Sequence, residues 1–241
     1  MRHRSEQYMA WLDKIKTTLK DAFTTVPWET AENSSGSTTI TKKARISSIA
    51  VAIILYIGFM SINFDTFSLV SVIIGIIAFS VAAMLWKSSR LKLFKFERIK
   101  GAHLLLALGV FILVGLIDLL LLSMLGTGKT ANDQAIDQSI QLRSTIWFVI
   151  LGTFIGPFVE EVVYRGMGLK YMFRGLPWVG VIVLSTIFAL THVPSNVIEF
   201  LIYFQSAVLY SFVYLKTKRF ELPLLMHMLN NAYTFIPLLF Q

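Results

Sequence analysis

Long apolar runs separated by short polar connections dominate the sequence. A helix needs about 20 mainly apolar residues to cross the hydrocarbon core of a bilayer. We therefore expect an all-α fold, a polytopic transmembrane helix bundle of about seven spans. The fifth run is short for a span, and the fourth is long enough to extend beyond the bilayer. The seven runs, some with polar residues inside them, are 46–63, 66–86, 102–124, 144–172, 178–194, 197–215 and 222–240.

The first 45 residues follow a different pattern. Residues 5–24 place apolar side chains at helical spacing, which is typical of an amphipathic helix on the membrane surface and equally of a solvated helix. The Ser/Thr-rich stretch NSSGSTT at 33–39 is typical of a flexible linker. No signal-peptide pattern precedes Ile46, so the first span is expected to be an uncleaved anchor.

Lysine and arginine gather in every second connection between the apolar runs. The connection at 87–100 holds six basic residues and one glutamate, whereas the one at 125–143 is nearly neutral. Basic connections stay on the cytoplasmic side of a membrane. The sequence thus predicts a cytoplasmic N-terminus, with a basic tail at 1–45 and a transmembrane domain at 46–241. The compact, basic chain fits a multi-pass protein of a plasma membrane, of the kind found in bacteria.

Composition narrows the possible functions. Hydrophobic residues make up 55% of the chain and charged residues 15%, against about a quarter charged in soluble domains. The net charge is +8, and the lysines and arginines that produce it lie beside apolar runs. This position favours contact with lipid headgroups and argues against a nucleic acid partner. The chain has no cysteine, which excludes disulfides, a thiolate nucleophile and thiolate metal ligands.

Two glutamates and an arginine lie within the fourth apolar run. A charge at membrane depth costs roughly 2.5–3.5 kcal/mol on insertion scales and therefore often marks a functional site. Glu161 and Arg165 stand four residues apart with the acid first, the favourable order for an ion pair within a helix. Glu160 lies about 100° around the helix from Glu161, so we expect it to remain unpaired. The pair by itself is more often structural than catalytic.

Imidazole and amide groups occur in the later runs. His192 lies in the fifth run, and the seventh places His227 and Asn231 on one helix face. Alone, each could be a helix-packing residue. Together with Glu160 they supply a general base and electrophilic donors. Residue counts from the turns predict that these groups meet in the cytoplasmic half of the membrane, provided that 166–176 projects from it. Asp118, in the third run, is a weaker candidate.

Three motifs carry a family resemblance. EEVVYR at 160–165 fits E-E-x-x-x-R, FALTH at 188–192 fits F-x-x-x-H, and HMLNN at 227–231 fits H-x-x-x-N. In this order on successive apolar segments they resemble the CAAX protease and bacteriocin-processing family, also called CPBP or Abi. The resemblance covers about 144–235, and the amino-terminal half shows nothing that matches.

The resemblance implies an intramembrane endopeptidase. Glu160 and His192 would activate the attacking water, His227 and Asn231 would hold the oxyanion, and Glu161 with Arg165 would brace the helix. Family members are often described as metalloproteases, and Glu160, His192 and His227 could make a zinc site. We expect a metal-free mechanism without a cofactor, because no H-E-x-x-H pair is present and the three ligands would come from three helices.

The expected partners are membrane lipid and a membrane-associated or lipid-anchored peptide or protein substrate, whose identity the sequence leaves open, as it does the oligomeric state. Within the resemblance, the biological roles are peptide processing, signalling and bacteriocin immunity. A non-proteolytic immunity or regulatory protein with the same fold is the alternative. A proton-coupled transporter would also use buried glutamate and histidine, but no interrupted, repeated helix pair is evident.

Overall fold

The computed structural model describes Met9, Asp13 and residues 42–63, 69–95, 97–126, 128–140 and 145–240. The expected surface helix at 5–24 and the linker at 33–39 lie outside these residues, apart from Met9 and Asp13. All regular elements of the described residues are helical, with no strand, which confirms the all-α fold class. Their bounds are α3 Lys42–Asn63, α4 Leu69–Ser88, α5 Gly101–Ser123, α6 Ala131–Ile140, α7 Thr145–Ile150, η2 Leu151–Ile155, α8 Gly156–Glu161, η3 Val162–Met172, α9 Pro177–Thr191, α10 Val197–Thr217, α11 Glu221–Phe235 and η4 Ile236–Phe240.

Five helices in the described part of the chain are long and apolar enough to cross a membrane. They are α3, α4, α5, the continuous helix Thr145–Met172 and α10. The expected span at 178–194 corresponds to α9, which has 15 residues. At a rise of 1.5 Å per residue it covers about 22 Å, less than the roughly 30 Å hydrocarbon core. The expected span at 222–240 corresponds to α11, which continues directly into η4, so that this run is helical from Glu221 to Phe240. The polytopic bundle is confirmed, and one of its seven expected spans is shorter than a full crossing.

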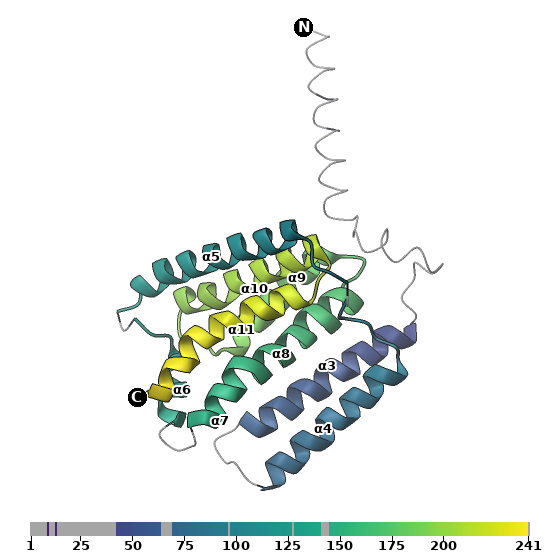
Figure 1. The fold of residues 1–241 in the computed structure, drawn as a ribbon, viewed down its shortest axis with the longest axis horizontal. Helices are drawn as coiled ribbons and strands as arrows, with labels where there is room; N and C mark the ends of the chain where they lie inside the picture. The colour runs from purple at the N-terminus through teal and green to yellow at the C-terminus, as the bar shows by residue number, and fades with distance from the viewer. Residues whose placement is uncertain are drawn as a thin grey trace.

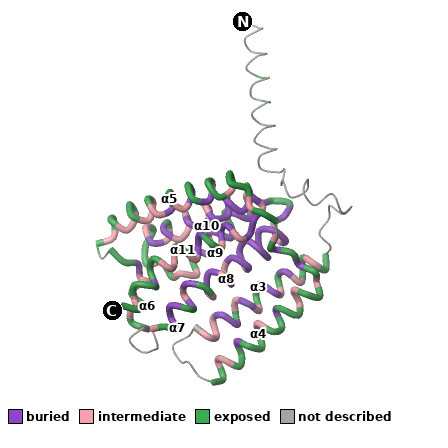
Figure 2. The backbone as a smooth tube through the Cα atoms, in the orientation of Figure 1, coloured by how far each residue is buried: buried purple, intermediate pink, exposed green. Residues whose placement is uncertain are grey.

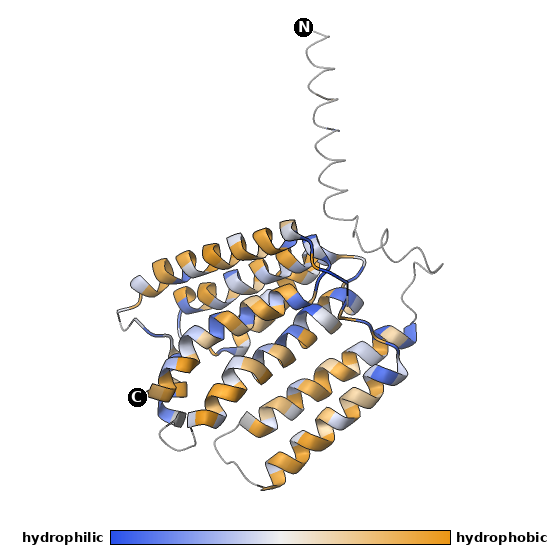
Figure 3. Cartoon of the chain, viewed as in Figure 1, coloured by the Kyte–Doolittle hydropathy of each residue, from blue (hydrophilic) through white to orange (hydrophobic). Residues whose placement is uncertain are grey.

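The long helices lie side by side, with α5 at one edge and α4 at the other (Figure 1). Purple, buried segments concentrate in the central helices, whereas the outer faces of α4 and α5 are largely green (Figure 2). These outer faces carry exposed isoleucine and leucine side chains such as Ile76 and Leu105, as expected of surfaces that meet lipid. Figure 3 shows the apolar residues along the helices and polar residues at the end that carries the 87–100 connection.

Small residues let the two amino-terminal helices approach closely. A Cβ atom on Gly58 of α3 would lie 2.6 Å from the Cβ of Ala78 on α4. A Cβ on Gly75 would lie 2.3 Å from the Ile62 side chain. Close backbone approach through small residues is a common way for helices to associate in lipid, where no hydrophobic force drives them together. α3 then packs on η3 and holds the outer α4 to the bundle.

The helix that carries the two glutamates changes its hydrogen-bond pattern twice. Residues 151–155 and 162–172 are π-helical, and α8 lies between them. Pro157 has no N–H to donate to the preceding turn, so a widened turn before it accommodates the missing bond. Such π-helical segments occur often at functional sites. Here they set the direction in which the side chains of α8 point.

Candidate active site

The two glutamates of α8 face different surroundings. The Glu161 side chain is fully buried, whereas the Glu160 side chain is 19% exposed and lines a cavity. Adjacent residues of a helix point about 100° apart, and this difference follows from that geometry. The structure thus places one carboxylate inside the protein and the other at a surface that substrate could reach.

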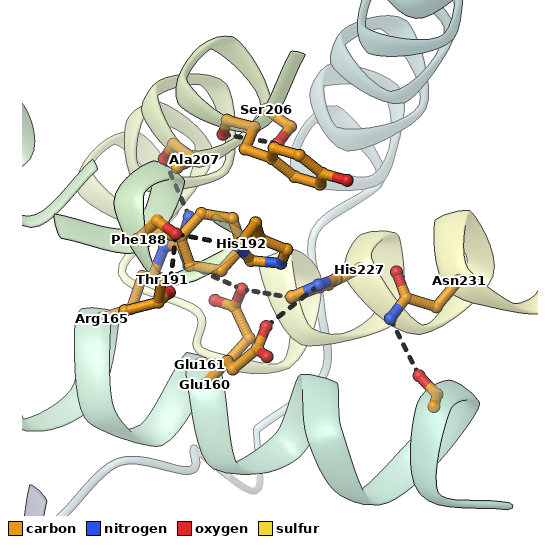
Figure 4. A network of polar contacts seen from close by, with 12 residues as sticks. Glu160, Glu161, Arg165, Phe188, Thr191, His192, Ser206, Ala207, His227 and Asn231 are labelled. Atoms are coloured by element: carbon orange, nitrogen blue, oxygen red, sulfur yellow. Dashed lines mark hydrogen bonds and ion pairs between the residues drawn. The ribbon is translucent and has the colours of Figure 1, made fainter. Parts of the chain in front are cut away.

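Glu161 lies in a network of buried polar groups (Figure 4). Its Oε1 accepts a hydrogen bond from Arg165 Nη1 at 2.9 Å, which is the ion pair that the spacing predicts. Arg165 Nη2 donates to the carbonyl oxygen of Ala207 on α10 at 2.9 Å. The guanidinium also lies over the rings of Phe188 and Tyr210, at 5.4 and 5.8 Å from their centroids. The arginine therefore joins α8 and η3 to α9 and α10.

His227 lies between the two carboxylates. Its Nδ1 is 3.0 Å from Glu161 Oε1, and its Nε2 is 3.5 Å from Glu160 Oε2. The expectation that Glu160 has no partner is therefore wrong. The helical wheel of the fourth run considered only that helix, whereas this partner comes from α11, far along the chain.

Proton positions around His227 follow from these contacts. An ionised carboxylate can only accept, so Nδ1 of His227 donates to Glu161. The neutral ring then has a bare nitrogen, Nε2, that faces a Glu160 oxygen. A bond between them needs one further proton, carried by either His227 or Glu160. The contact places an imidazole nitrogen beside the Glu160 carboxylate at the edge of the cavity, an arrangement suited to proton transfer.

His192 directly follows the last residue of α9. Its Nδ1 lies 2.8 Å from the carbonyl oxygen of Phe188, one turn earlier. Because a carbonyl only accepts, Nδ1 carries the proton, and Nε2 of the neutral ring is left as a base. The imidazole stacks on Tyr203 of α10, with ring centroids 4.1 Å apart. The next residue, Val193, has a φ of 49°, a strained value for a β-branched residue that ends the helix at this point.

Asn231 connects α11 to the widened turn of the fourth helix. Its Nδ2 donates to the carbonyl oxygen of Gly152 at 2.8 Å. An amide nitrogen has two hydrogens, so one donor remains for another acceptor. Gly152 also allows close packing, since a Cβ there would lie 2.4 Å from the ring of Phe235.

Glu160, His192 and Asn231 line one cavity of about 240 Å³. His227 does not line it, because its side chain lies behind Glu160 and is only 6% exposed. The cavity also has walls that sequence reasoning missed, including Tyr56 of α3 and Thr191. Thr191 stands next to His192 within the FALTH motif, and this position was the available signal. Tyr56 had none, because a tyrosine in an apolar run is common.

The position of the site along the bundle differs from our expectation. Asn132, Ala135 and Ile136 of α6 line the cavity, and α6 belongs to the nearly neutral 125–143 connection. The site therefore lies toward the end opposite the basic 87–100 connection and not toward the predicted cytoplasmic end. The 166–176 stretch lies against the basic 87–100 connection. Lys170 is buried, and its Nζ donates to the carbonyl oxygen of Lys92 at 2.7 Å.

The contacts of the two histidines bear on the zinc alternative. Within the described residues no group of three or more histidine, aspartate or glutamate side chains is arranged to hold a metal ion. Both nitrogens of His227 face carboxylates, and Nδ1 of His192 faces a carbonyl. A histidine that binds a metal commonly donates its other ring N–H to a carboxylate or a carbonyl, as His227 and His192 do here. The contacts of the two rings therefore fit both the metal-free mechanism and the zinc alternative.

Comparisons with known proteins cover the region that holds this site. Residues 142–233 match the family described as type II CAAX prenyl endopeptidase Rce1-like. This stretch includes Glu160, His192, His227 and Asn231. The chain is thus similar to Rce1-like CAAX proteases over these residues. The predicted family resemblance is confirmed.

Two curated bacterial proteins are similar to part of this chain. One is the membrane-embedded CAAX protease MroQ of Staphylococcus aureus, 33% identical over 97 residues, which are 37% of this chain and 38% of that protein. The other is the putative membrane peptidase YdiL of Bacillus subtilis, 29% identical over 114 residues, 46% of this chain and 45% of that protein. The chain thus spans less than half the length of these relatives. No solved structure matches it significantly.

Proposed function

We propose that this chain is an intramembrane endopeptidase that hydrolyses a peptide bond in a membrane-associated or lipid-anchored peptide or protein. The observation that carries the proposal is the single cavity lined by Glu160, His192 and Asn231 inside an otherwise apolar bundle. The match of residues 142–233 to the Rce1-like family supports it. Since the relatives come from bacteria, the location proposed is a bacterial plasma membrane.

In the proposed reaction, a water molecule held between Glu160 and Nε2 of His192 attacks the substrate carbonyl carbon. One of these two groups takes the proton that the water loses, as a general base. The carbon–nitrogen bond then breaks, and the same proton goes to the leaving amine. Water is thereby added across the peptide bond, and no metal or other cofactor is needed.

The negative charge on the carbonyl oxygen needs a donor in the cavity. Asn231 supplies one through the amide hydrogen that Gly152 does not use. His227 would supply a second only after its Nε2 leaves Glu160. Until then its role is to position the Glu160 carboxylate. Glu161 and Arg165 hold His227 and the surrounding helices in place.

The proposal is tested by comparing the membrane peptides of cells that carry the wild-type chain with those that carry Glu160→Ala. A proteolytic function predicts a membrane protein that accumulates uncut in the Glu160→Ala cells, together with a product present only in the wild type. If the two peptide sets are identical while a cellular phenotype depends on the chain, the protein acts by binding, as the immunity or regulatory alternative requires.

A further inference from the structure

A second cavity adjoins the candidate active site. It has a volume of about 530 Å³ and lies between α5, α10 and α11. Asn231 and Phe235 line both cavities, and Tyr203, which stacks on His192, forms part of the wall of the second. A chain that lies across Asn231 would thus extend from the reactive groups into this neighbouring space. Most of its other lining side chains are apolar, among them Phe111, Leu116 and Ile202.

Two carboxylates interrupt the apolar lining. Asp118 is contributed by α5, from within a transmembrane run, and Asp133 by the first turn of α6. Among the described residues, none of those that line the cavity is lysine or arginine. A carboxylate at such a depth is costly unless a cation or good donors compensate it.

The hydrogen bonds described for both carboxylates come from neutral groups, while Lys129 also acts on Asp133 through its charge. Asp118 Oδ1 accepts from Gln205 Nε2 at 2.8 Å. Asp133 Oδ2 accepts from the backbone nitrogen and the hydroxyl of Thr130, at 3.0 and 2.8 Å. The nearby Lys129 is 57% exposed and binds Asp137 at 2.6 Å, outside the cavity. Because the hydrogen bonds described for Asp118 use only Oδ1, its Oδ2 remains to accept from a ligand.

We propose that this second cavity binds a basic side chain, lysine or arginine, within an apolar segment of the peptide substrate, with Asp118 and Asp133 as its counter-charges. This assignment rests on the proposed endopeptidase function and adds the substrate class. Charge complementarity selects the occupant: the cavity accepts apolar side chains along most of its wall and offers negative charge at two points. Its shared wall with the active site fixes the basic residue close to the scissile bond.

A purely structural role for Asp118 makes a different prediction. Its bond to Gln205 ties α5 to α10, and an asparagine at 118 keeps an oxygen that can accept the same bond. Asp118→Asn therefore keeps the helix contact and removes the charge. Asp133→Asn does the same for the contacts with Thr130. The two variants separate charge recognition from folding, and either can serve if the other fails to fold.

The test uses binding, so that it does not depend on turnover. The probes are two fluorescent twelve-residue peptides of leucine and alanine, one with a central lysine and its twin with norleucine. Binding is measured by fluorescence anisotropy to the full chain with Glu160→Gln in phosphatidylcholine nanodiscs. The lysine peptide should bind at least about tenfold more tightly, within the range of a hydrogen bond to a charged group. Adding Asp118→Asn or Asp133→Asn should reduce this preference to less than about threefold.

Asp137→Asn is the matched control, because it removes the same charge from α6 outside the cavity, and it should leave the preference unchanged. Equal binding of the two peptides, no binding of either, or a preference that survives Asp118→Asn combined with Asp133→Asn would overturn the assignment. A preference that disappears when phosphatidylethanolamine is added would also overturn it, because a lipid amine would then be the occupant.

The same peptides separate failure of this inference from failure of the proposed function. If the wild-type protein cleaves both peptides at equal rates, the proposed endopeptidase function stands and the proposed basic subsite is refuted. If the lysine peptide binds tightly and in a charge-dependent way, but the wild type cleaves no peptide or membrane protein, the subsite stands and the endopeptidase function is refuted.

Discussion

Exchange of Glu161 for glutamine removes the charge that faces Arg165 in the interior of the bundle. Both side chains are at most 1% exposed, and Glu161 Oε1 is 2.9 Å from Arg165 Nη1. Removing one partner of a buried ion pair typically costs about 3–5 kcal/mol, because the other charge stays buried without compensation. His227 Nδ1 loses the same negative charge at 3.0 Å. We expect Glu161→Gln to lower the free energy of unfolding by about that amount.

Glu160→Gln is the matched comparison, since it makes the same chemical change one residue earlier. The Glu160 side chain is 19% exposed and its contact with His227 is longer, at 3.5 Å. Its loss should cost less than about 1 kcal/mol, in the range of partly exposed ion pairs. For a protein of this size, about 3–5 kcal/mol corresponds to a fall in the melting temperature of roughly 6–20 °C. Thermal unfolding of the two purified variants in the same detergent measures the difference.

A double variant sharpens the comparison. Glu161→Gln combined with Arg165→Met removes both charges, and replacing a buried pair by apolar groups is often nearly neutral. The double variant should therefore be more stable than Glu161→Gln alone. If Glu161→Gln melts within about 2 °C of the wild type while Glu160→Gln loses its fold, the roles assigned to the two glutamates are reversed.

Three further outcomes are expected. Gly152→Ala should reduce activity and stability together, because its Cβ would lie 2.4 Å from the Phe235 ring, and equal activity with unchanged melting would contradict this packing. Burial lowers the pKa of Lys218 from 10.5 to about 7. As the pH falls from 10.5 to about 7, this shift lowers the free energy of unfolding by a growing amount, and most of the loss is reached at about pH 7. Since Lys218 also has a φ of 56°, which favours glycine, Lys218→Gly should raise the melting temperature more at pH 7 than at pH 10, and a gain independent of pH would refute the charge argument. In intact cells an impermeant thiol reagent should label Gln134→Cys on α6 and not Ser88→Cys beside the basic connection, and the reverse would overturn the predicted orientation.

Local sequence patterns predicted many helices of the bundle and many of the residues that form its candidate site. Runs of apolar residues predicted the helices, because each run must satisfy its own backbone hydrogen bonds in lipid. The spacing of Glu161 and Arg165 predicted their pairing, since residues four apart share a helix face. In both cases the determining interaction lies within one helix.

Contacts between helices could not be predicted from patterns within a single helix. His227 reaches Glu160 and Glu161 from α11, and no spacing within the fourth helix indicates that contact. Apolar composition did not reveal that α9 stops at Thr191. Nor did a polar connection such as 125–143 indicate that α6 would form and line the cavity. These features arise from tertiary packing, which overrides local pattern.

Hydrolysis by Glu160 and His192 is proposed to proceed without a metal. The cleavage rate of the purified protein after exhaustive chelation, with its metal content determined on the same sample, tests this mechanism. The substrate is the membrane peptide that accumulates in the Glu160→Ala cells. We expect metal-free protein to keep its full rate, and this rate to disappear in Glu160→Gln. Stoichiometric zinc in the untreated protein, with activity lost on chelation and restored by zinc, would contradict it.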